Sequence, residues 1–215
     1  MTWIAIAIIV AGLVVLFRLE TGGLSTRQAE ARIRRQLFRA AGRQPEWRSA
    51  SIRVESEPLG LSVDERMDPE RPEPFHVASV GKLFTAVLVG REIEAGRLSL
   101  NTAVAPLLPP ATLDGLFLWN DRDYQSEVTV DHLLRHTSGV ADYFDDPASD
   151  SPKVSELIAR EPEHTWTPKE LLRFSAERQK AVGPPGERYH YSDTGYAILG
   201  LLLQEVRGSS FEELL

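Results

Sequence analysis

Two strongly apolar helical segments constrain the fold of this 215-residue chain more than any other feature. The first is predicted to follow Lys82 and to continue to about Ala95, with apolar residues almost all round its circumference. The second is predicted from about Gly195 to Val206, and Gly208 is its stop signal. A helix that is apolar all round is stable only when other elements cover it. We therefore expect both helices inside the protein, the first of them central and buried.

Composition places the chain among globular proteins and excludes several kinds of site. Hydrophobic residues make up 42% and charged residues 26%, which is ordinary for a folded domain. There is no cysteine, which rules out disulfides, zinc–thiolate sites and a thiol nucleophile. Residues 1–48 carry eight Arg and three Glu, so they are basic, and the rest of the chain is strongly acidic. An acidic body repels phosphate backbones, so nucleic acid is not an expected partner.

The amino-terminal segment, residues 1–19, is predicted to be a membrane anchor. Trp3–Phe17 is a continuous run of apolar residues and glycine that is closed by Arg18. Such a run is shorter than a typical transmembrane helix and similar in length to the apolar region of a signal peptide. No Lys or Arg precedes it and no small-residue cleavage site follows closely, so an uncleaved anchor is favoured over a cleaved signal.

Residues 20–48 are predicted to form a basic arm that contains an amphipathic helix. Ser25-Thr26-Arg27-Gln28 is a capping-box pattern, which marks the start of that helix. Its apolar stripe could pack on the globular domain, or its basic face could lie on anionic lipid. Residues 49–215 are predicted to be the globular domain. It opens with a strand hairpin formed by Ser49–Glu55 and Gly60–Asp64.

Three further helix starts are readable along this domain. Thr129 is predicted to cap a short helix, and Thr167 caps another that has Pro168 at its first position. Ser210–Glu213 is again a capping box, two residues before the sequence stops. A helix of fewer than two turns has little stability by itself. We therefore expect that these 215 residues are not the whole protein.

Ser79 and Lys82 are the sharpest candidates for chemistry. Residues three positions apart share one face of a helix, so the lysine amine can reach the serine hydroxyl. A serine needs a base beside it to act as a nucleophile, and a desolvated lysine can provide one. Tyr191-Ser192-Asp193 precedes the second apolar helix, and its phenol could share the proton taken from Ser79.

Four ordered blocks give the chain a resemblance to a known family. It resembles the serine hydrolases that comprise class C β-lactamases, D-alanyl-D-alanine carboxypeptidases and family VIII esterases. The resemblance covers roughly residues 50 to 215. The matching blocks are Ala78-Ser79-Val80-Gly81-Lys82-Leu83-Phe84-Thr85, Glu94-Ala95-Gly96-Arg97-Leu98-Ser99-Leu100, Thr129-Val130-Asp131-His132-Leu133-Leu134-Arg135-His136-Thr137-Ser138-Gly139 and Pro185-Gly186-Glu187-Arg188-Tyr189-His190-Tyr191-Ser192.

This resemblance implies both a fold and a set of roles. The implied fold is α/β (α+β), of the β-lactamase/transpeptidase type, with an antiparallel sheet flanked by helices and a mostly helical lobe. It implies Ser79 as the acyl-forming nucleophile, Lys82 as its proton partner and Tyr191 as base or proton relay, with no metal or cofactor. The family's third motif, a Lys/His-Thr/Ser-Gly triplet, is expected beyond residue 215, so the domain looks truncated.

Asp193 departs from the family pattern, which usually has asparagine at this position. An amide can donate a hydrogen bond to a substrate carbonyl, and an ionised carboxylate cannot. Asp193 could instead hold Lys82 charged and weaken it as a base. It is therefore a predicted site residue whose role, substrate binding or tuning of the site, stays open.

The predicted function is a serine hydrolase that cuts an ester, an amide or a β-lactam through an acyl-enzyme on Ser79. The alternative is a membrane-tethered binding or regulatory module that keeps the fold without turnover. Expected partners are a small-molecule or peptide substrate and, through the amino-terminal segment, a membrane. The domain is expected outside the cytoplasm, although the arginine-rich arm favours the opposite orientation by the positive-inside rule. The oligomeric state is left open.

Other polar groups give weaker signals. His132 and His136 have the helical spacing of zinc ligands, but no glutamate base follows His132, so a structural role is predicted. His76 and His190 flank the two catalytic blocks and are expected to be packing or rim residues. A group of aspartates in one loop could hold calcium but lacks the EF-hand spacing, so a solvated acidic loop is predicted. Its members are Asp142, Asp145, Asp146 and Asp150.

Overall fold

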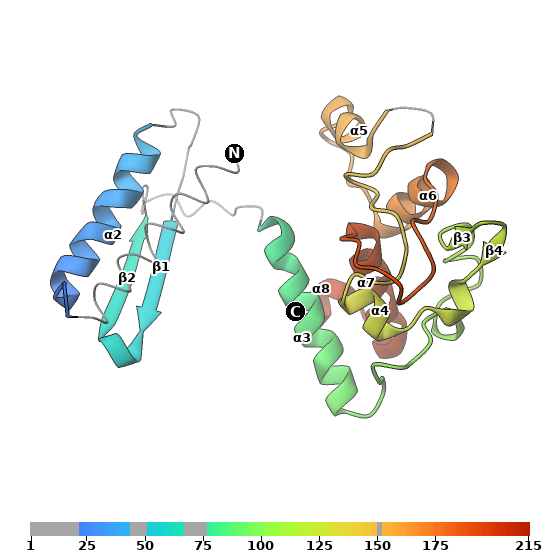
Figure 1. Cartoon of the computed structure of the whole chain (residues 1–215), viewed down its shortest axis with the longest axis horizontal. Coiled ribbons are helices and arrows are strands. Elements are labelled where there is room, and N and C mark those ends of the chain that lie inside the picture. The colour runs from blue at the N-terminus through green and yellow to red at the C-terminus, as the bar shows by residue number, and fades with distance from the viewer. Residues whose placement is uncertain (1–21, 44–50, 67–76, 150–151) are drawn as a thin grey trace. The chain divides into compact units, whose positions relative to one another are not determined.

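The computed structural model describes residues 22–43, 51–66, 77–149 and 152–215. The predicted anchor at residues 1–19 lies outside these ranges, as do His76 and Asp150. Within them, no helix is both long and apolar enough to cross a membrane. The chain divides into two compact units, residues 1–76 and 77–215 (Figure 1).

In the first unit, one helix packs on a two-stranded antiparallel hairpin. Helix α2, Thr26–Ala41, begins at the predicted capping box of Ser25 and Gln28. Strands β1, Ser51–Ser56, and β2, Leu61–Arg66, form the predicted hairpin, with Val54 opposite Val63. The buried residues come from one stripe of α2 and one face of β2: Ala29, Ile33, Leu61 and Val63. The apolar stripe of α2 therefore packs on this hairpin.

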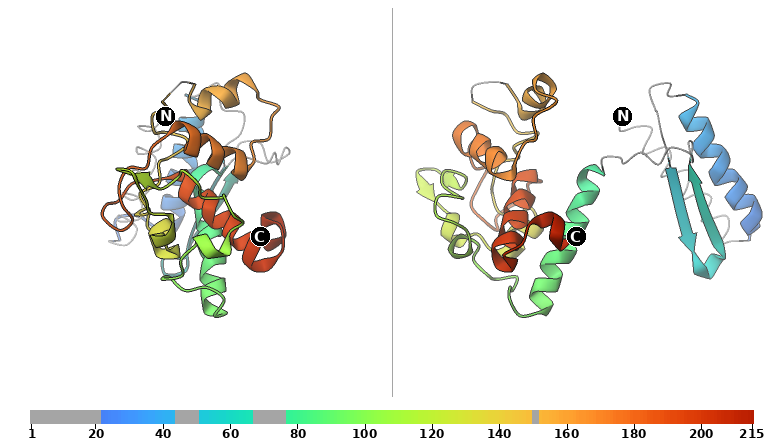
Figure 2. Two further views of the ribbon diagram at one scale, coloured as in Figure 1. Left: turned by 90° about the vertical axis from the view of Figure 1, so that its right-hand side faces the viewer. Right: turned by 180° about the vertical axis from the view of Figure 1, so that it is seen from behind.

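The second unit is mostly helical and is built around α7, Asp193–Arg207 (Figures 1 and 2). Helix α7 contacts four other helices, so its apolar residues form the centre of the core. These helices are α3 (Gly81–Glu94), α4 (Val130–Leu134), α6 (Pro168–Arg178) and α8 (Phe211–Leu214). The core residues of α7 that are fully buried are Ile198, Leu199, Leu202 and Leu203.

The remaining elements of this unit are short. Strands β3, Leu118–Trp119, and β4, Arg122–Asp123, form a second antiparallel pair, and α5, Val154–Arg160, lies further along the chain. The predicted caps are present: the side chains of Thr129, Thr167 and Ser210 each accept a backbone N–H at the start of their helices. These capping residues correctly predicted where the helices begin, because a cap satisfies N–H groups that no other part of the helix can satisfy.

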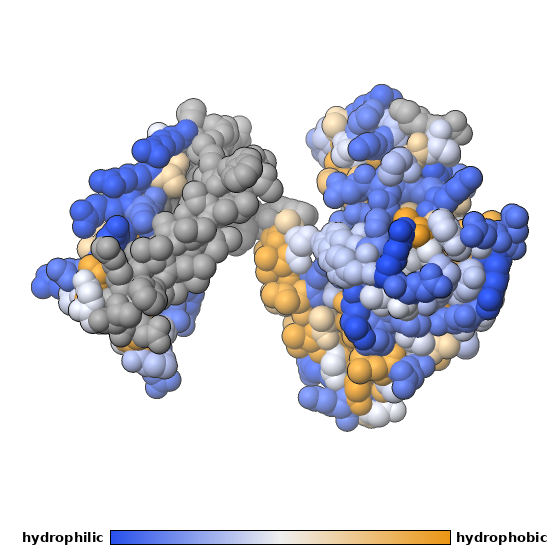
Figure 3. Space-filling view, in the orientation of Figure 1, coloured by the Kyte–Doolittle hydropathy of each residue, from blue (hydrophilic) through white to orange (hydrophobic). Residues whose placement is uncertain are grey.

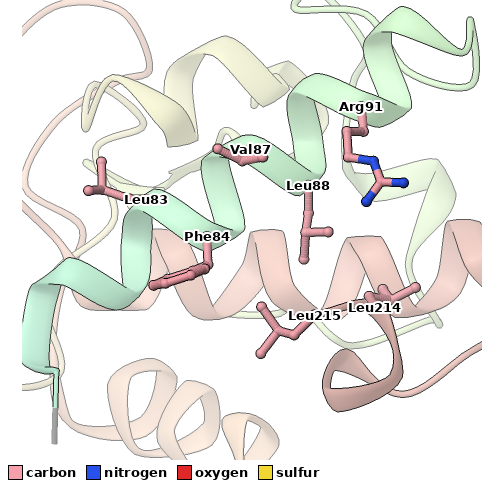
Figure 4. A pocket seen from close by; sticks show the side chains of 7 residues that line it. All are labelled: Leu83, Phe84, Val87, Leu88, Arg91, Leu214 and Leu215. Carbon is pink, nitrogen blue, oxygen red and sulfur yellow. The ribbon is translucent and has the colours of Figure 1, made fainter. Parts of the chain in front are cut away.

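The prediction that α3 is buried all round is wrong. Leu88 and Val89 are buried, but the side chains of Leu83, Phe84 and Val87 are 65%, 53% and 63% exposed. Figure 3 shows the apolar patch that results along this helix. The helix packs against α7, and the face that carries Leu83, Phe84 and Val87 stays exposed within this unit. A pocket of about 310 Å³ lies on this side, and Leu214 and Leu215 help to line it. Figure 4 shows the side chains that line this pocket.

Candidate active site

Ser79 lies in a single 3₁₀ turn, Ala78–Val80, that continues directly into α3. Ala78 has a left-handed φ of 48°, a conformation that costs an L-residue roughly 1–2 kcal/mol. Lys82 follows in the first turn of α3, and its Nζ lies 3.5 Å from Ser79 Oγ. Ser79 is exposed, so its hydroxyl is accessible to a substrate. The predicted i, i+3 geometry is present.

Tyr191 is held beside Ser79 by the start of α7. Its Oη lies 2.7 Å from Ser79 Oγ, within hydrogen-bond distance. The next residue, Ser192, is the N-cap of α7 and accepts the N–H of Gly195. The buried Ser192 hydroxyl also donates to the carbonyl of Ala141 at 3.0 Å. These two bonds fix the backbone from which the Tyr191 ring extends.

Asp193 is the first residue of α7, and its carboxylate forms an ion pair and hydrogen bond with Lys82 Nζ. The side chains of Lys82 and Asp193 are only 16% and 23% exposed. Burial by itself lowers the pKa of Lys82, but hydrogen bonds to Asp193 and Tyr191 and their charges raise it above its ordinary value. Lys82 is therefore a cation at neutral pH, and all four predicted site residues meet at one place.

A charged Lys82 can donate hydrogen bonds but cannot accept a proton. Tyr191 Oη and Lys82 Nζ both lie within hydrogen-bond distance of Ser79 Oγ. Of these two, Tyr191 Oη is the one that can accept a hydrogen bond from the serine hydroxyl. Lys82 Nζ also lies 4.9 Å from the centre of the Tyr191 ring, within the range of a cation–π contact. The arrangement places the Ser79 hydroxyl within hydrogen-bond distance of a phenol and of a fixed positive charge.

His136 lies at the same place, which the sequence reasoning did not foresee. Its ring stacks on that of Tyr191, with centroids 4.5 Å apart and planes inclined by 27°. Its Nδ1 accepts the backbone N–H of Ser192 at 3.1 Å. Burial, followed by the nearby positive charge of Lys82, lowers the pKa of His136 below its ordinary 6.5. His136 is therefore neutral at pH 7. Its position two residues before Ser138-Gly139, in a block that matched the family, was the available signal.

Asp142 contradicts the prediction of a solvated acidic loop. Its side chain is buried, and its Oδ1 accepts the backbone N–H groups of Phe144 and Asp193, at 3.2 and 3.1 Å. Burial raises the pKa of Asp142 above its ordinary value. Asp145 is exposed, as predicted, so only part of this loop is solvated. Asp142 differs because its carboxylate ties the loop to the first residue of α7.

Gly139 allows this loop to approach a neighbouring one closely. Its φ is 78°, and a Cβ at this position would lie 1.9 Å from the carbonyl oxygen of Gly183. Its carbonyl accepts the N–H of Val182 at 2.8 Å. Any other residue would push apart the two loops that hold His136 and Tyr191.

Tyr143 is another phenol near the site. Burial, then the negative charges of Asp193 and Asp142, raise the pKa of Tyr143 to about 12. Its backbone N–H donates to the buried hydroxyl of Thr194 at 2.9 Å. Tyr143 therefore stays protonated at neutral pH and can only donate or accept hydrogen bonds as a neutral phenol.

The other histidines have structural partners. His132 Nδ1 accepts the N–H of Thr129 in the capping box of α4, the role predicted for it. His190 pairs with Asp146 at 2.7 Å, and His164 with Glu170 at 3.2 Å. Among the described residues, no group of three or more His, Asp or Glu side chains is placed to hold a metal ion.

Residues 56–215 match the family model described as Beta-lactamase, so the chain belongs to that family. Among curated proteins, it is 33% identical over 141 residues to "Penicillin-binding protein 4" of Amycolatopsis lactamdurans and 28% identical over 149 residues to "Protein flp" of Staphylococcus aureus. These matches cover 66% and 69% of this chain but only 32% and 26% of those proteins. The chain thus spans a third or less of these relatives.

Solved structures confirm the predicted fold class. The structure of a D-stereospecific amidohydrolase from Streptomyces sp. is 25% identical, with a TM-score of 0.60. That of a penicillin-binding protein from Bacillus halodurans is 29% identical, with a TM-score of 0.52. Each match covers 77% of this chain and 46% of the other. The site residues thus lie on a β-lactamase/transpeptidase-like fold.

Proposed function

We propose that this protein is a serine hydrolase that forms an acyl-enzyme on Ser79. The observation that carries the proposal is the 2.7 Å contact between Ser79 Oγ and Tyr191 Oη, with the Lys82 ammonium 3.5 Å from the same oxygen. A nucleophile, a proton acceptor and a fixed cation within hydrogen-bond reach are the parts that covalent acyl transfer requires.

The mechanism requires Tyr191 as the phenolate, paired with the Lys82 ammonium. In the first half of the reaction, Ser79 Oγ attacks the acyl carbon while its proton passes to this phenolate oxygen, which becomes the neutral phenol. The carbonyl oxygen takes the negative charge, and the bond from the acyl carbon to the leaving nitrogen or oxygen then breaks. Tyr191 returns the proton to that leaving atom. In the second half, water attacks the ester, Tyr191 accepts a proton from it, and Ser79 Oγ leaves with that proton. Lys82 stays charged and stabilises the phenolate at each transfer.

The substrate is proposed to be an amide, an ester or a β-lactam. The names of the penicillin-binding relatives and of the D-stereospecific amidohydrolase support an acyl group or leaving group of the D-amino-acid type. Esters remain within the proposal because the same attack on an activated carbonyl needs no other residue. No residue of the site requires a metal or an organic cofactor for these steps.

A second candidate is a membrane-tethered module that binds ligand without turnover. The ion pair between Asp193 and Lys82 favours it, because a carboxylate at this position lacks the amide donor and adds negative charge to the site. Both candidates place the domain outside the cytoplasm, held to the membrane by residues 1–19.

The test is covalent labelling of the purified chain with a fluorescent penicillin, together with hydrolysis of a p-nitrophenyl ester and of a D-amino acid amide. Ser79→Ala is the matched control. We expect labelling or hydrolysis that disappears in Ser79→Ala. Absence of any Ser79-dependent reaction with all three reagents, together with saturable non-covalent binding of the penicillin, would contradict the hydrolase and favour the binding module.

A further inference from the structure

The loop 136–143 runs beside the segment 190–194 and is bonded to it along its length. Four of these bonds join backbone to backbone or to side chains: His190 N to His136 O at 2.7 Å, Ser192 Oγ to Ala141 O at 3.0 Å, Asp193 N to Asp142 Oδ1 at 3.1 Å and Tyr143 N to Thr194 Oγ1 at 2.9 Å. They hold the backbone on both sides of Tyr191, but none of them touches its ring.

His136 is different because it holds both the backbone and the ring. Its carbonyl accepts the N–H of His190, and its Nδ1 accepts the N–H of Ser192, so it bonds both neighbours of Tyr191. Its ring then stacks on the Tyr191 ring at 4.5 Å. Tyr196 lies 5.0 Å away, and its hydroxyl donates to the carbonyl of Leu134 at 3.1 Å. The imidazole is therefore a fixed spacer between two tyrosine rings.

The backbone at His136 is strained in a way that serves this contact. Its φ is 56°, in the left-handed region that non-glycine residues rarely adopt. Strain of this kind persists where surrounding contacts hold it, and it is frequent at functional sites. Here the strained residue is the one whose ring and carbonyl both hold the Tyr191 segment.

We infer that His136 is a positioning residue that fixes the Tyr191 phenol against Ser79, and that it does so only as a neutral imidazole. Its hydrogen bonds and ring contacts go to the segment around Tyr191 and to Tyr196, so its effect on the reaction passes through Tyr191. The inference concerns the geometry of Tyr191, and its consequence for acylation rests on the proposed function.

Neutrality matters because Nδ1 is the acceptor. Protonation places an N–H against the N–H of Ser192 and breaks that bond. The groups that face the imidazole are Lys82 from α3, Asp193 and Tyr196 from α7, and Tyr189, His190 and Tyr191 from the preceding segment. Burial and then Lys82 oppose protonation, and Asp193 favours it. The positioning should therefore be intact at pH 7 and be lost as the pH falls below 6.5.

Two variants separate the two contacts. His136→Asn keeps an acceptor close to the position of Nδ1 and suits a left-handed φ, but it removes the ring. His136→Phe keeps a ring and removes the acceptor. His132→Asn is the matched control, because His132 also accepts a backbone N–H through Nδ1 but lies in the α4 cap and makes no ring contact with Tyr191.

The first measurement does not depend on catalysis. Tyr191 ring resonances are followed by NMR in protein labelled with ¹³C-tyrosine and assigned with Tyr191→Phe. We expect them to shift in His136→Asn, to stay in place in His132→Asn, and to move in the wild type together with the Ser192 amide as the pH falls below 6.5. Tyr191 resonances that are unchanged in folded His136→Asn, or in the wild type across this titration, would overturn the inference.

The second measurement is the rate of Ser79 labelling by a fluorescent penicillin between pH 5 and 8. We expect His136→Asn and His136→Phe to be slower at pH 7 by about three- to tenfold, the size of an aromatic contact or a hydrogen bond. The wild-type rate should fall below pH 6.5, and His136→Asn should lack that fall. Wild-type rates and an unchanged pH profile in both variants would overturn the inference. If the wild type itself is not labelled, the proposed function fails, and the NMR result alone decides the role of His136.

Discussion

Replacing Asp193 with asparagine should make Ser79 react faster. The Asp193 carboxylate pairs with Lys82 Nζ, and both side chains are more than three-quarters buried. This pairing, together with Tyr191, outweighs the effect of burial and raises the pKa of Lys82. The asparagine side chain has nearly the same shape and keeps an acceptor oxygen for the ammonium. It removes one negative charge from beside Lys82 and Tyr191, the latter being the group proposed to take the Ser79 proton.

The size of the effect follows from the partial burial of the pair. Two unit charges at about 4 Å interact with about 4 kcal/mol at an effective dielectric constant of 20, which sets the scale of the charge interaction that Asp193→Asn removes. The amide dipole and solvent at the exposed part of the pair recover much of this. We expect the activation free energy for labelling of Ser79 to fall by about 1.4 kcal/mol. This corresponds to a labelling rate about tenfold higher at pH 7.

The assay compares the labelling rate by a fluorescent penicillin in the wild type and in Asp193→Asn. Asp145→Asn is the matched control, since it removes an exposed charge from the nearby acidic loop without touching Lys82. NMR titration of ¹⁵N-labelled Lys82 Nζ gives a second reading, and its midpoint should move to lower pH in Asp193→Asn only. A labelling rate that is equal or lower, with the Lys82 titration unchanged, would refute the reasoning that the Asp193 charge slows the transfer of the Ser79 proton to Tyr191.

Three further predictions follow from the same contacts. Tyr191→Phe removes the acceptor 2.7 Å from Ser79 Oγ and should lower the labelling rate at least about 100-fold, the usual size of general-base catalysis; retention of the rate would assign proton transfer to Lys82. Ser192→Ala loses an N-cap and a buried hydrogen bond, so denaturant unfolding should show a loss of about 2 kcal/mol. The pKa of His136 is depressed in the folded state, so the wild type should lose stability as the pH falls below 6.5, and His136→Asn should lose less; equal pH dependence in both would contradict this assignment.

The local elements of the fold were readable from the sequence because their signals are local. The capping boxes at Ser25, Thr129 and Ser210 and the capped, proline-started helix at Thr167 all occur where they were predicted. A cap acts within four residues, so it needs no knowledge of the rest of the chain. The i, i+3 relation of Ser79 and Lys82 was predicted for the same reason, because it depends only on local helix geometry.

The burial of each element could not be predicted from such local signals. The apolar residues of α3 led to a prediction of full burial. Apolar side chains show only that a helix face favours contact with other apolar groups, and Leu83, Phe84 and Val87 are exposed in the described part of the chain. Asp142 is the opposite case, because an aspartate in an acidic loop is normally solvated, and here two backbone N–H groups from different segments satisfy its buried carboxylate. Burial depends on which segments meet, and composition does not specify that.

The sequence by itself determined the helix starts, the i, i+3 spacing of Ser79 and Lys82, and the family. It also placed Tyr191 and Asp193 at the start of one helix. Only the tertiary structure decided that Asp193 pairs with Lys82 and that the His136 ring stacks on Tyr191. The physical reason is distance: these partners are separated by more than fifty residues along the chain, and their charges and rings interact only at a few ångströms. The protonation state of the site is therefore a property of the folded chain.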